Sequence, residues 1–185
     1  MKTLTMTAAS LLAVFASSNV VAANDHSGFY VGGSVGQLKL KAEGNSDSGI
    51  GYGIYGGYNF NDWFGLETHM FLSGDLGGNG QDKGAGYLAL TPKFTYQIDD
   101  TFSVYGKIGI ASMAVVFERD NQRDEDLSGF GVVYGVGINA SVTENLNIRL
   151  GYDIVKGDLD SDFPFNRKDI DTDISSLALG VHYQF

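Results

Sequence analysis

The last nine residues of the chain, 177–185, alternate between apolar side chains and small or polar ones up to the final residue. The apolar members are Leu177, Leu179, Val181, Tyr183 and Phe185. Since successive side chains of a β-strand point to opposite faces, this segment is predicted to be a strand with one apolar face. A soluble sheet can show the same alternation. A strand that ends the chain on an aromatic residue, behind a signal peptide, favours an outer-membrane barrel instead.

The amino terminus has the three parts of a secretory signal peptide. Lys2 supplies the positive start, residues 8–16 are mostly apolar, and residues 21–23 offer a cleavage site after Ala23. The apolar part is too short to cross about 30 Å of hydrocarbon, which argues against a membrane anchor. We therefore expect a signal peptide over residues 1–23 and one outer-membrane β-barrel over residues 24–185.

Composition excludes several other classes of protein. The chain has no cysteine, so disulfide frameworks and thiolate metal sites are excluded. No apolar run of helix-spanning length follows the signal, which argues against a helical membrane protein. The net charge of −10 argues against nucleic-acid binding, which needs clustered lysine and arginine.

The mature sequence reads as eight strands in which tight turns and longer connections alternate. Tight turns are predicted at residues 61–62, 99–100 and 143–145, and longer connections at 42–48, 74–84, 118–127 and 156–172. The predicted strands are residues 28–40, 50–60, 63–72, 86–98, 101–117, 129–142, 146–155 and 173–185. An up-and-down barrel with short periplasmic turns and long outer loops requires this order. The predicted fold is all-β, an eight-stranded antiparallel up-and-down transmembrane barrel.

The alternation also predicts which face of each strand meets lipid. In the seventh strand Leu146, Ile148 and Leu150 share one face, whereas Asn147 and Arg149 share the other. An eight-stranded lumen is only wide enough for side chains to fill it, so small residues and a few long charged ones suit the inside. The apolar face is therefore predicted to point outward, opposite to a soluble ligand-binding barrel. Aromatic residues near the tight turns suit the membrane interface.

Several blocks of the sequence resemble the membrane domain of the OmpA-like outer-membrane barrel family. They are GFYVGG (28–33), GGYNF (56–60), FGLE (64–67), KFTY (93–96), YGKIG (105–109), VTENL (142–146), RLGY (149–152) and the last nine residues. The resemblance implies the barrel without the peptidoglycan-binding domain of the long family members. It also implies that the outer-membrane assembly machinery recognises Gly180, Tyr183 and Phe185.

The same resemblance implies an ionic cluster inside the barrel. Glu67, Lys93, Lys107 and Arg149 stand where the family's interior acidic and basic residues stand, and Asp153 is a further carboxylate that compensates the excess of bases. Since buried unpaired charge is costly, these groups are expected to pair or to hold water. Two interpretations stay open: a gate whose pairs switch to open a narrow pore, and a polar core that fills space.

Two other groups of residues suggest chemistry less strongly. Asp158, Asp160, Asp162 and Asp169 have the spacing of a calcium loop, but Phe163 replaces the glycine that such a loop needs at its sixth position. They are weak metal candidates, and we expect no cofactor.

Two histidines raise the question of hydrolysis, because some eight-stranded outer-membrane barrels are lipid A enzymes. His182 is predicted to point into the lumen near the periplasmic end, and His69 to lie near the opposite rim. No serine, histidine and acidic residue are predicted to lie close enough together to form a catalytic set, so we do not expect an enzyme.

The sequence therefore predicts an integral protein of the Gram-negative outer membrane with a structural or adhesion-type role carried by acidic extracellular loops. The alternative is a small channel gated by the interior charges, and a lipid A-modifying enzyme is a third possibility. Expected partners are outer-membrane lipid and lipopolysaccharide, the assembly machinery, and a host-surface or phage ligand at the loops.

Overall fold

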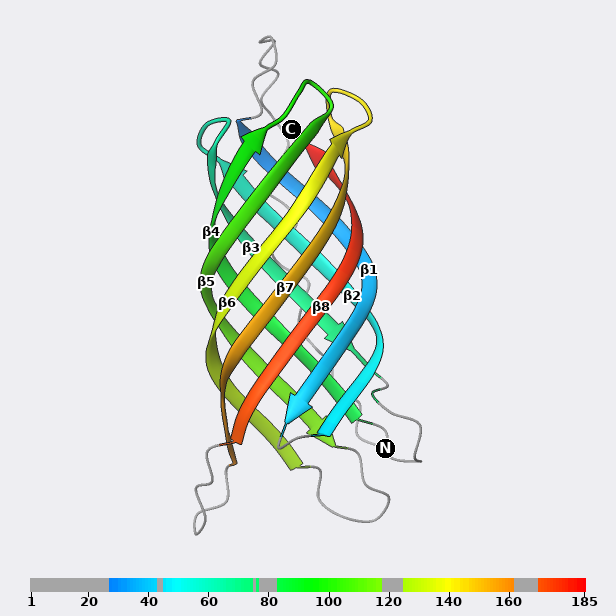
Figure 1. The fold of residues 1–185 in the computed structure, drawn as a ribbon, viewed down its shortest axis with the longest axis vertical. Helices are drawn as coiled ribbons and strands as arrows, with labels where there is room; N and C mark the ends of the chain where they lie inside the picture. Colours follow the sequence, from blue (N-terminus) through cyan, green and yellow to red (C-terminus); the bar gives the residue numbers. More distant parts are fainter. Residues whose placement is uncertain (1–26, 43–44, 75, 77–82, 118–124, 162–169) are drawn as a thin grey trace.

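The computed structural model describes residues 27–42, 45–74, 76, 83–117, 125–161 and 170–185. They form eight antiparallel strands that close into one barrel, which confirms the predicted fold class (Figure 1). The strands are β1 (Gly28–Ala42), β2 (Asn45–Asn59), β3 (Phe64–Ser73), β4 (Lys83–Gln97), β5 (Phe102–Phe117), β6 (Glu125–Ser141), β7 (Leu146–Ser161) and β8 (Ile170–Gln184). The predicted signal peptide lies outside the described residues. Within them, no helix is long and apolar enough to cross a membrane.

Each strand pairs with its neighbours in the sequence, and β1 pairs with β8 to close the cylinder. The closing ladder runs from Tyr30↔Gln184 to Ala42↔Thr172. It is extended at one end by the Phe185 amide, which donates to the Phe29 carbonyl oxygen at 2.9 Å. Closure leaves no unpaired strand edge, which is the condition for a sheet to stand in hydrocarbon.

The three tight turns lie together with the carboxy terminus at one end of the barrel, the upper end in Figure 1. In each turn a side-chain oxygen accepts hydrogen bonds from backbone amides two and three residues further along. The acceptors are Asn61, Asp99 and Thr143, and the bonds to the third amides measure 2.8, 2.7 and 3.0 Å. Asn, Asp and Thr favour turns for this reason, so the local sequence alone defines these three connections.

In the structure, apolar side chains point outward from the wall and polar ones point into the lumen, as the alternation predicts. Outward residues such as Leu150 and Leu179 are about half exposed on the isolated barrel, at 49% and 54%. The polar residues Arg149 and His182, at inward positions of the same two strands, are buried in the lumen. The outward apolar band runs around all eight strands, as a surface in contact with lipid tails requires.

Several strands are longer than predicted at the end opposite the tight turns. β2 begins at Asn45 rather than at residue 50, and β7 continues to Ser161 rather than ending at 155. Here the alternation changes phase: Lys39 points outward and Leu40 inward, and Lys156 points outward and Val155 inward. The ladder continues because backbone hydrogen bonds do not depend on side-chain polarity. The sequence signal ends earlier, because it depends on an apolar outer face.

Candidate functional site in the barrel lumen

The lumen contains five charged side chains that we call the ionic network: Glu67, Lys93, Lys107, Arg149 and Asp153. They come from β3, β4, β5 and β7, and each is at most 5% exposed. Strand pairing brings their positions to similar heights, since Lys93 lies opposite Lys107 and Gly135 lies between Lys107 and Asp153. The structure thus brings together all five interior residues named from the sequence.

Glu67 is the centre of the network and is fully buried. Its Oε1 lies 2.9 Å from Lys107 Nζ, and its Oε2 lies 2.6 Å from an Arg149 guanidinium nitrogen. Tyr30 donates its hydroxyl to the same Oε2 at 2.7 Å. Charge-assisted bonds of this length are stronger than neutral ones, so this one carboxylate connects β3 to three other strands of the wall across the lumen.

Lys93 is connected to Glu67 through Tyr30. Its Nζ donates to the Tyr30 hydroxyl at 2.8 Å and lies 4.0 Å from the centre of the tyrosine ring. The ring face therefore supplies a cation–π contact in addition to the hydrogen bond. This arrangement differs from a simple carboxylate–lysine pair, and Tyr30 was not identified from the sequence.

Asp153 forms a second centre, linked to the first by Lys107. Its Oδ2 lies 3.0 Å from Lys107 Nζ and 3.0 Å from His69 Nδ1. Tyr87 donates to the same oxygen at 3.1 Å and contacts the Ser176 hydroxyl at 2.8 Å. Lys107 therefore bridges both carboxylates, and the network is one connected unit rather than separate pairs.

Tyrosine rings fill the space between the charges, and glycines make room for them. The Arg149 guanidinium lies 4.5 Å from the Tyr55 ring centre and 4.6 Å from that of Tyr105. A Cβ at Gly137 would come within 2.4 Å of the Tyr105 hydroxyl, so the tyrosine occupies the space that a larger residue would take. The pattern of inward glycines opposite inward tyrosines is present in the sequence, but the strand pairing that joins them is not.

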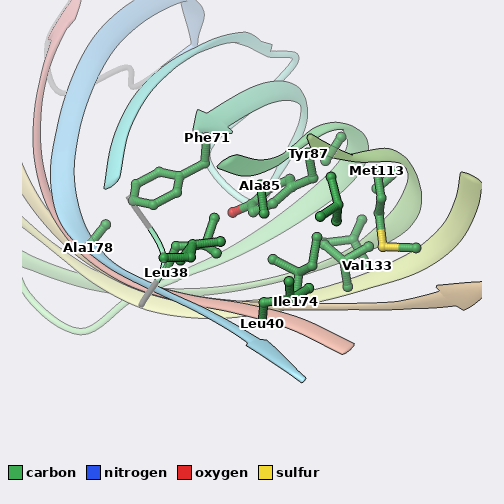
Figure 2. Close-up of a cluster of buried hydrophobic side chains, with 14 residues drawn as sticks. Leu38, Leu40, Phe71, Ala85, Tyr87, Met113, Val133, Ile174 and Ala178 are labelled. Atoms are coloured by element: carbon green, nitrogen blue, oxygen red, sulfur yellow. The ribbon is translucent and has the colours of Figure 1, made fainter. Parts of the chain in front are cut away.

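Beyond the ionic network, towards the end with the longer connections, the lumen is filled by apolar side chains that we call the apolar cap (Figure 2). Phe71 and Leu38 are fully buried there, together with Leu76 from the segment after β3. The remaining members are Leu40, Ala85, Tyr87, Ala89, Ala111, Met113, Val115, Val133, Val155, Ile174 and Ala178. The small and charged residues predicted for the inside fill only part of the lumen, and this apolar part corrects that prediction. On β1 the apolar Leu40 points inward where the outer face becomes polar, whereas on β3 both faces are apolar, with Phe71 inward and Leu72 outward.

The spaces left in the lumen are small. One cavity of about 20 Å³ lies beside the ionic network. It is lined by residues carrying four buried polar atoms that have no hydrogen-bond partner among the described residues: Ser34 Oγ, His69 Nε2, Asp153 Oδ1 and one Arg149 nitrogen. That volume suits about one water molecule with several polar partners.

A second cavity of about 40 Å³ opens at the end with the tight turns and is lined mainly by amide and hydroxyl side chains. Lys93 and His182 also line it.

The structure corrects the predicted position of His69. The sequence placed it near the rim, but it is buried beside Asp153, because strands around it extend further than predicted: β4 begins at Lys83 and β7 ends at Ser161. Ser176 Oγ is hydrogen-bonded to Tyr87 rather than to His69. His182 points into the lumen as expected, with its Nδ1 3.3 Å from the Tyr55 hydroxyl.

The weak metal candidates fall at the edge of the described structure. Asp158 and Asp160 belong to β7 rather than to a loop, which corrects the predicted connection over residues 156–172. Asp162 and Asp169 lie outside the described residues. Among the residues that are described, no group of three or more histidine, cysteine or acidic side chains is placed to hold a metal ion.

Of the three residues assigned to assembly recognition, Gly180 and Tyr183 lie on opposite faces of β8 and Phe185 directly follows its last residue. Tyr183 and Phe185 point outward, 46% and 51% exposed, with ring centres 5.1 Å apart in an edge-to-face contact. Gly180 points inward, where an added Cβ would lie 2.8 Å from the Tyr55 hydroxyl. The two aromatic residues are therefore accessible on the strand surface, whereas Gly180 is needed for packing inside.

Phe185→Ala is expected to reduce the amount of protein that reaches the outer membrane more than it reduces the stability of barrel already folded. The backbone bond from Phe185 to Phe29 survives the change, so the finished ladder loses only an interface side chain. Immunoblots of membrane and periplasmic fractions measure the first effect, and urea unfolding of refolded protein the second. Phe60→Ala is the matched control, because Phe60 is an equally exposed aromatic at the same end (55%). Equal outer-membrane levels for Phe185→Ala and Phe60→Ala would contradict the assembly role.

Comparison with protein families agrees with this architecture. Residues 7–185 match the model described as "Outer membrane protein beta-barrel domain". A 22 kDa outer membrane protein of Rhizobium leguminosarum is 29% identical over 84% of this chain and 77% of its own length. Outer membrane protein A of Klebsiella pneumoniae is 29% identical over 74% of this chain and 41% of its own length. The chain thus spans about half or less of the outer membrane protein A sequences that it matches.

Solved structures share the fold at low sequence identity. Neisserial surface protein A has a TM-score of 0.72 at 17% identity, covering 86% of this chain and 98% of that one. Ail, the attachment invasion locus protein of Yersinia pestis, has a TM-score of 0.61 at 20% identity, covering 86% and 99%. Ail was also solved in complex with the heparin analogue sucrose octasulfate.

Proposed function

Since the chain belongs to the outer-membrane β-barrel family and is a protein of the Gram-negative outer membrane, we propose that it acts at the cell surface. The proposed role is structural or adhesion-type, and the connections at the end opposite the tight turns carry it. The observation that supports this proposal is the filled lumen: the ionic network and the apolar cap lie in series along the barrel axis. A wall with a filled interior leaves the loops as the part that can meet other molecules.

The charge of these connections limits the partners that fit. Between the strand ends of the structure, the connections over residues 43–44, 74–82, 118–124 and 162–169 have formal charges of −1, −2, −1 and 0, which together are negative, within a chain whose total is −10. A sulfated polyanion of the kind bound by Ail would be repelled by such loops, so we do not extend that ligand to this protein. A host-surface or phage ligand with a basic surface is the better match.

Enzymatic activity is not part of the proposal. A lipid A hydrolase needs a nucleophile and a base within hydrogen-bond reach of each other, at a surface that its lipid can reach. Ser176 and His69 are both buried in the lumen, at 2% and 7% exposure. Lipid A mass spectrometry of cells with and without the protein would reveal an activity that contradicts this view.

Replacement of residues 118–124 and 162–169 by Gly-Ser segments of equal length tests the loop role. Cells that express this variant are expected to lose binding to host-cell or phage surfaces while they keep wild-type outer-membrane permeability. A variant with the same loop residues in scrambled order keeps length and charge, and so separates sequence recognition from simple electrostatics. Surface binding unchanged by the Gly-Ser replacement would refute the proposal.

The alternative function, a gated channel, is tested by measuring the conductance of the purified barrel. Since the ionic network and the apolar cap both fill the lumen, the wild-type barrel is expected to show no ion-conducting steps in a planar lipid bilayer. Glu67→Ala alone is expected to leave the bilayer silent, because the apolar cap still fills the lumen beyond it. Regular conductance steps from the wild-type barrel would favour the channel over the surface role.

A further inference from the structure

The ionic network carries one more positive than negative charge. Its members are two carboxylates and three cations: Glu67, Asp153, Lys93, Lys107 and Arg149. Lys107 contacts both carboxylates, and Arg149 contacts Glu67. Lys93 reaches a carboxylate through the Tyr30 hydroxyl, so among the described residues it is the cation of the network whose charge has no direct partner.

Lys93 is buried with most of its hydrogen-bonding capacity unused. The residue is 4% exposed, and its ammonium group donates to the Tyr30 hydroxyl at 2.8 Å. An ammonium group has three protons to donate, and the other two have no acceptor among the residues that the structure describes. Because a buried charge without an opposite charge is costly, this position favours an additional negative group beside Lys93.

The space for such a group is the second cavity of the lumen, which we call the periplasmic cavity. Lys93 lines it, and it opens at the end with the tight turns, which is the periplasmic end of an outer-membrane barrel. Since β4 continues past Lys93 to Gln97, Lys93 lies at the inner end of this cavity. The volume of about 40 Å³ exceeds the about 10–15 Å³ that one water molecule needs, so a small ion fits.

Neutral donors lie around the same cavity. The Ser103 hydroxyl accepts a hydrogen bond from the Asn139 amide at 3.2 Å, and so keeps its own proton to donate. The side-chain oxygen of Asn147 accepts from Ser141 at 2.8 Å, whereas its amide nitrogen has no acceptor among the described residues. Hydroxyl and amide protons beside an ammonium group complement an anion.

One carboxylate also lines the periplasmic cavity. Asp62 belongs to the tight turn after β2 and is exposed to water at the open end. Water and dissolved ions screen its charge there. The Lys93 ammonium group lies in the buried interior, where opposite charges attract each other more strongly than in water. An anion beside Lys93 is therefore attracted more than Asp62 repels it.

We infer that Lys93, Ser103 and Asn147 form a binding site for a small monovalent anion, such as chloride, that enters from the periplasm. One such ion balances the excess positive charge of the ionic network. It enters and leaves at the same end, because the apolar cap fills the lumen beyond the network. The site goes beyond the proposed surface role, since it lies at the opposite end of the barrel and needs none of the loop residues.

The test follows urea unfolding of the barrel in phosphatidylcholine vesicles while chloride replaces gluconate at constant ionic strength. Gluconate has the same charge but is too large for a cavity of about 40 Å³. An ion that binds only the folded barrel stabilises it. Well above the Kd, the folding equilibrium constant should therefore rise about tenfold for each tenfold increase in chloride. Constant ionic strength excludes general screening as the cause.

Two substitutions remove the site in different ways. Lys93→Met removes the charge that attracts the anion. Asn139→Asp supplies a carboxylate of the protein itself beside the cavity, and the Asn139 Oδ1 already accepts a hydrogen bond from Arg149 Nε at 3.0 Å, so the isosteric change fits. Both variants should lose the chloride dependence. Lys156→Met is the matched control: it removes an exposed lysine of the outer wall and should keep the full dependence.

Crystals of the wild-type barrel soaked in bromide provide a measurement that needs no variant. An anomalous peak within hydrogen-bond distance of Lys93 Nζ is expected. The inference fails if wild-type stability does not depend on chloride, if Lys93→Met or Asn139→Asp keeps the dependence, or if bromide binds only outside the lumen. The barrel with Gly-Ser loops should retain the chloride dependence, so failure of this site and failure of the surface role are distinguishable.

Discussion

Glu67→Ala is expected to lower the free energy of unfolding by about 3–5 kcal/mol, the range for breaking a buried ion pair by removing one partner. The substitution deletes the acceptor of Lys107, Arg149 and Tyr30 in a position with no exposure to water. Asp153 still contacts Lys107, but Arg149 loses its carboxylate partner and Lys93 loses the carboxylate that it reaches through Tyr30. Urea unfolding of the barrel in lipid vesicles measures the loss.

Two further variants make this result specific. Leu150→Val changes a lipid-facing side chain one position from Arg149 and should leave the unfolding midpoint near that of wild type. Adding Arg149→Met to Glu67→Ala removes the cation that loses its direct carboxylate partner, so the double variant should lose less stability than the sum of the two single changes. If Glu67→Ala unfolds at the wild-type urea concentration, the ionic network does not hold the barrel together.

Phe71→Ala is expected to cost about 3–5 kcal/mol as well, through a cavity in the apolar cap. Its ring is fully buried, stacks on Tyr87 with centres 6.2 Å apart, and covers the glycines at 51 and 53. A Cβ at Gly51 would come within 2.3 Å of this ring, so the wall is shaped around the phenylalanine. The same urea titration in vesicles measures the effect.

The neighbouring residue provides the control for this prediction. Leu72 follows Phe71 on the same strand but points outward and is 49% exposed on the isolated barrel. Because lipid tails are as apolar as leucine, Leu72→Ala should cost much less than Phe71→Ala. Equal losses for the two substitutions would mean that the cap is not a packed core.

Local sequence determined the parts of this protein that depend on neighbouring residues. The three tight turns follow from Asn61, Asp99 and Thr143, whose side chains bond to amides within the same turn. The apolar outward band follows from a two-residue period, because lipid selects the polarity of one face over the whole crossing. Glu67, Lys93, Lys107, Arg149 and Asp153 could be assigned to the lumen by the same parity.

Tertiary structure alone decided which of these interior groups meet. Glu67 contacts Arg149 across 82 positions of sequence, and Tyr30 joins Lys93 to Glu67 from a third strand. Alternation gives the face of a residue but neither its height nor its partner across the lumen, which depend on the pairing of all eight strands. The apolar cap was missed for a related reason. Phe71 points inward while Leu72 faces lipid, so alternating polarity gives no signal where both faces are apolar, and only the closed barrel shows that such inward residues from several strands meet in the lumen.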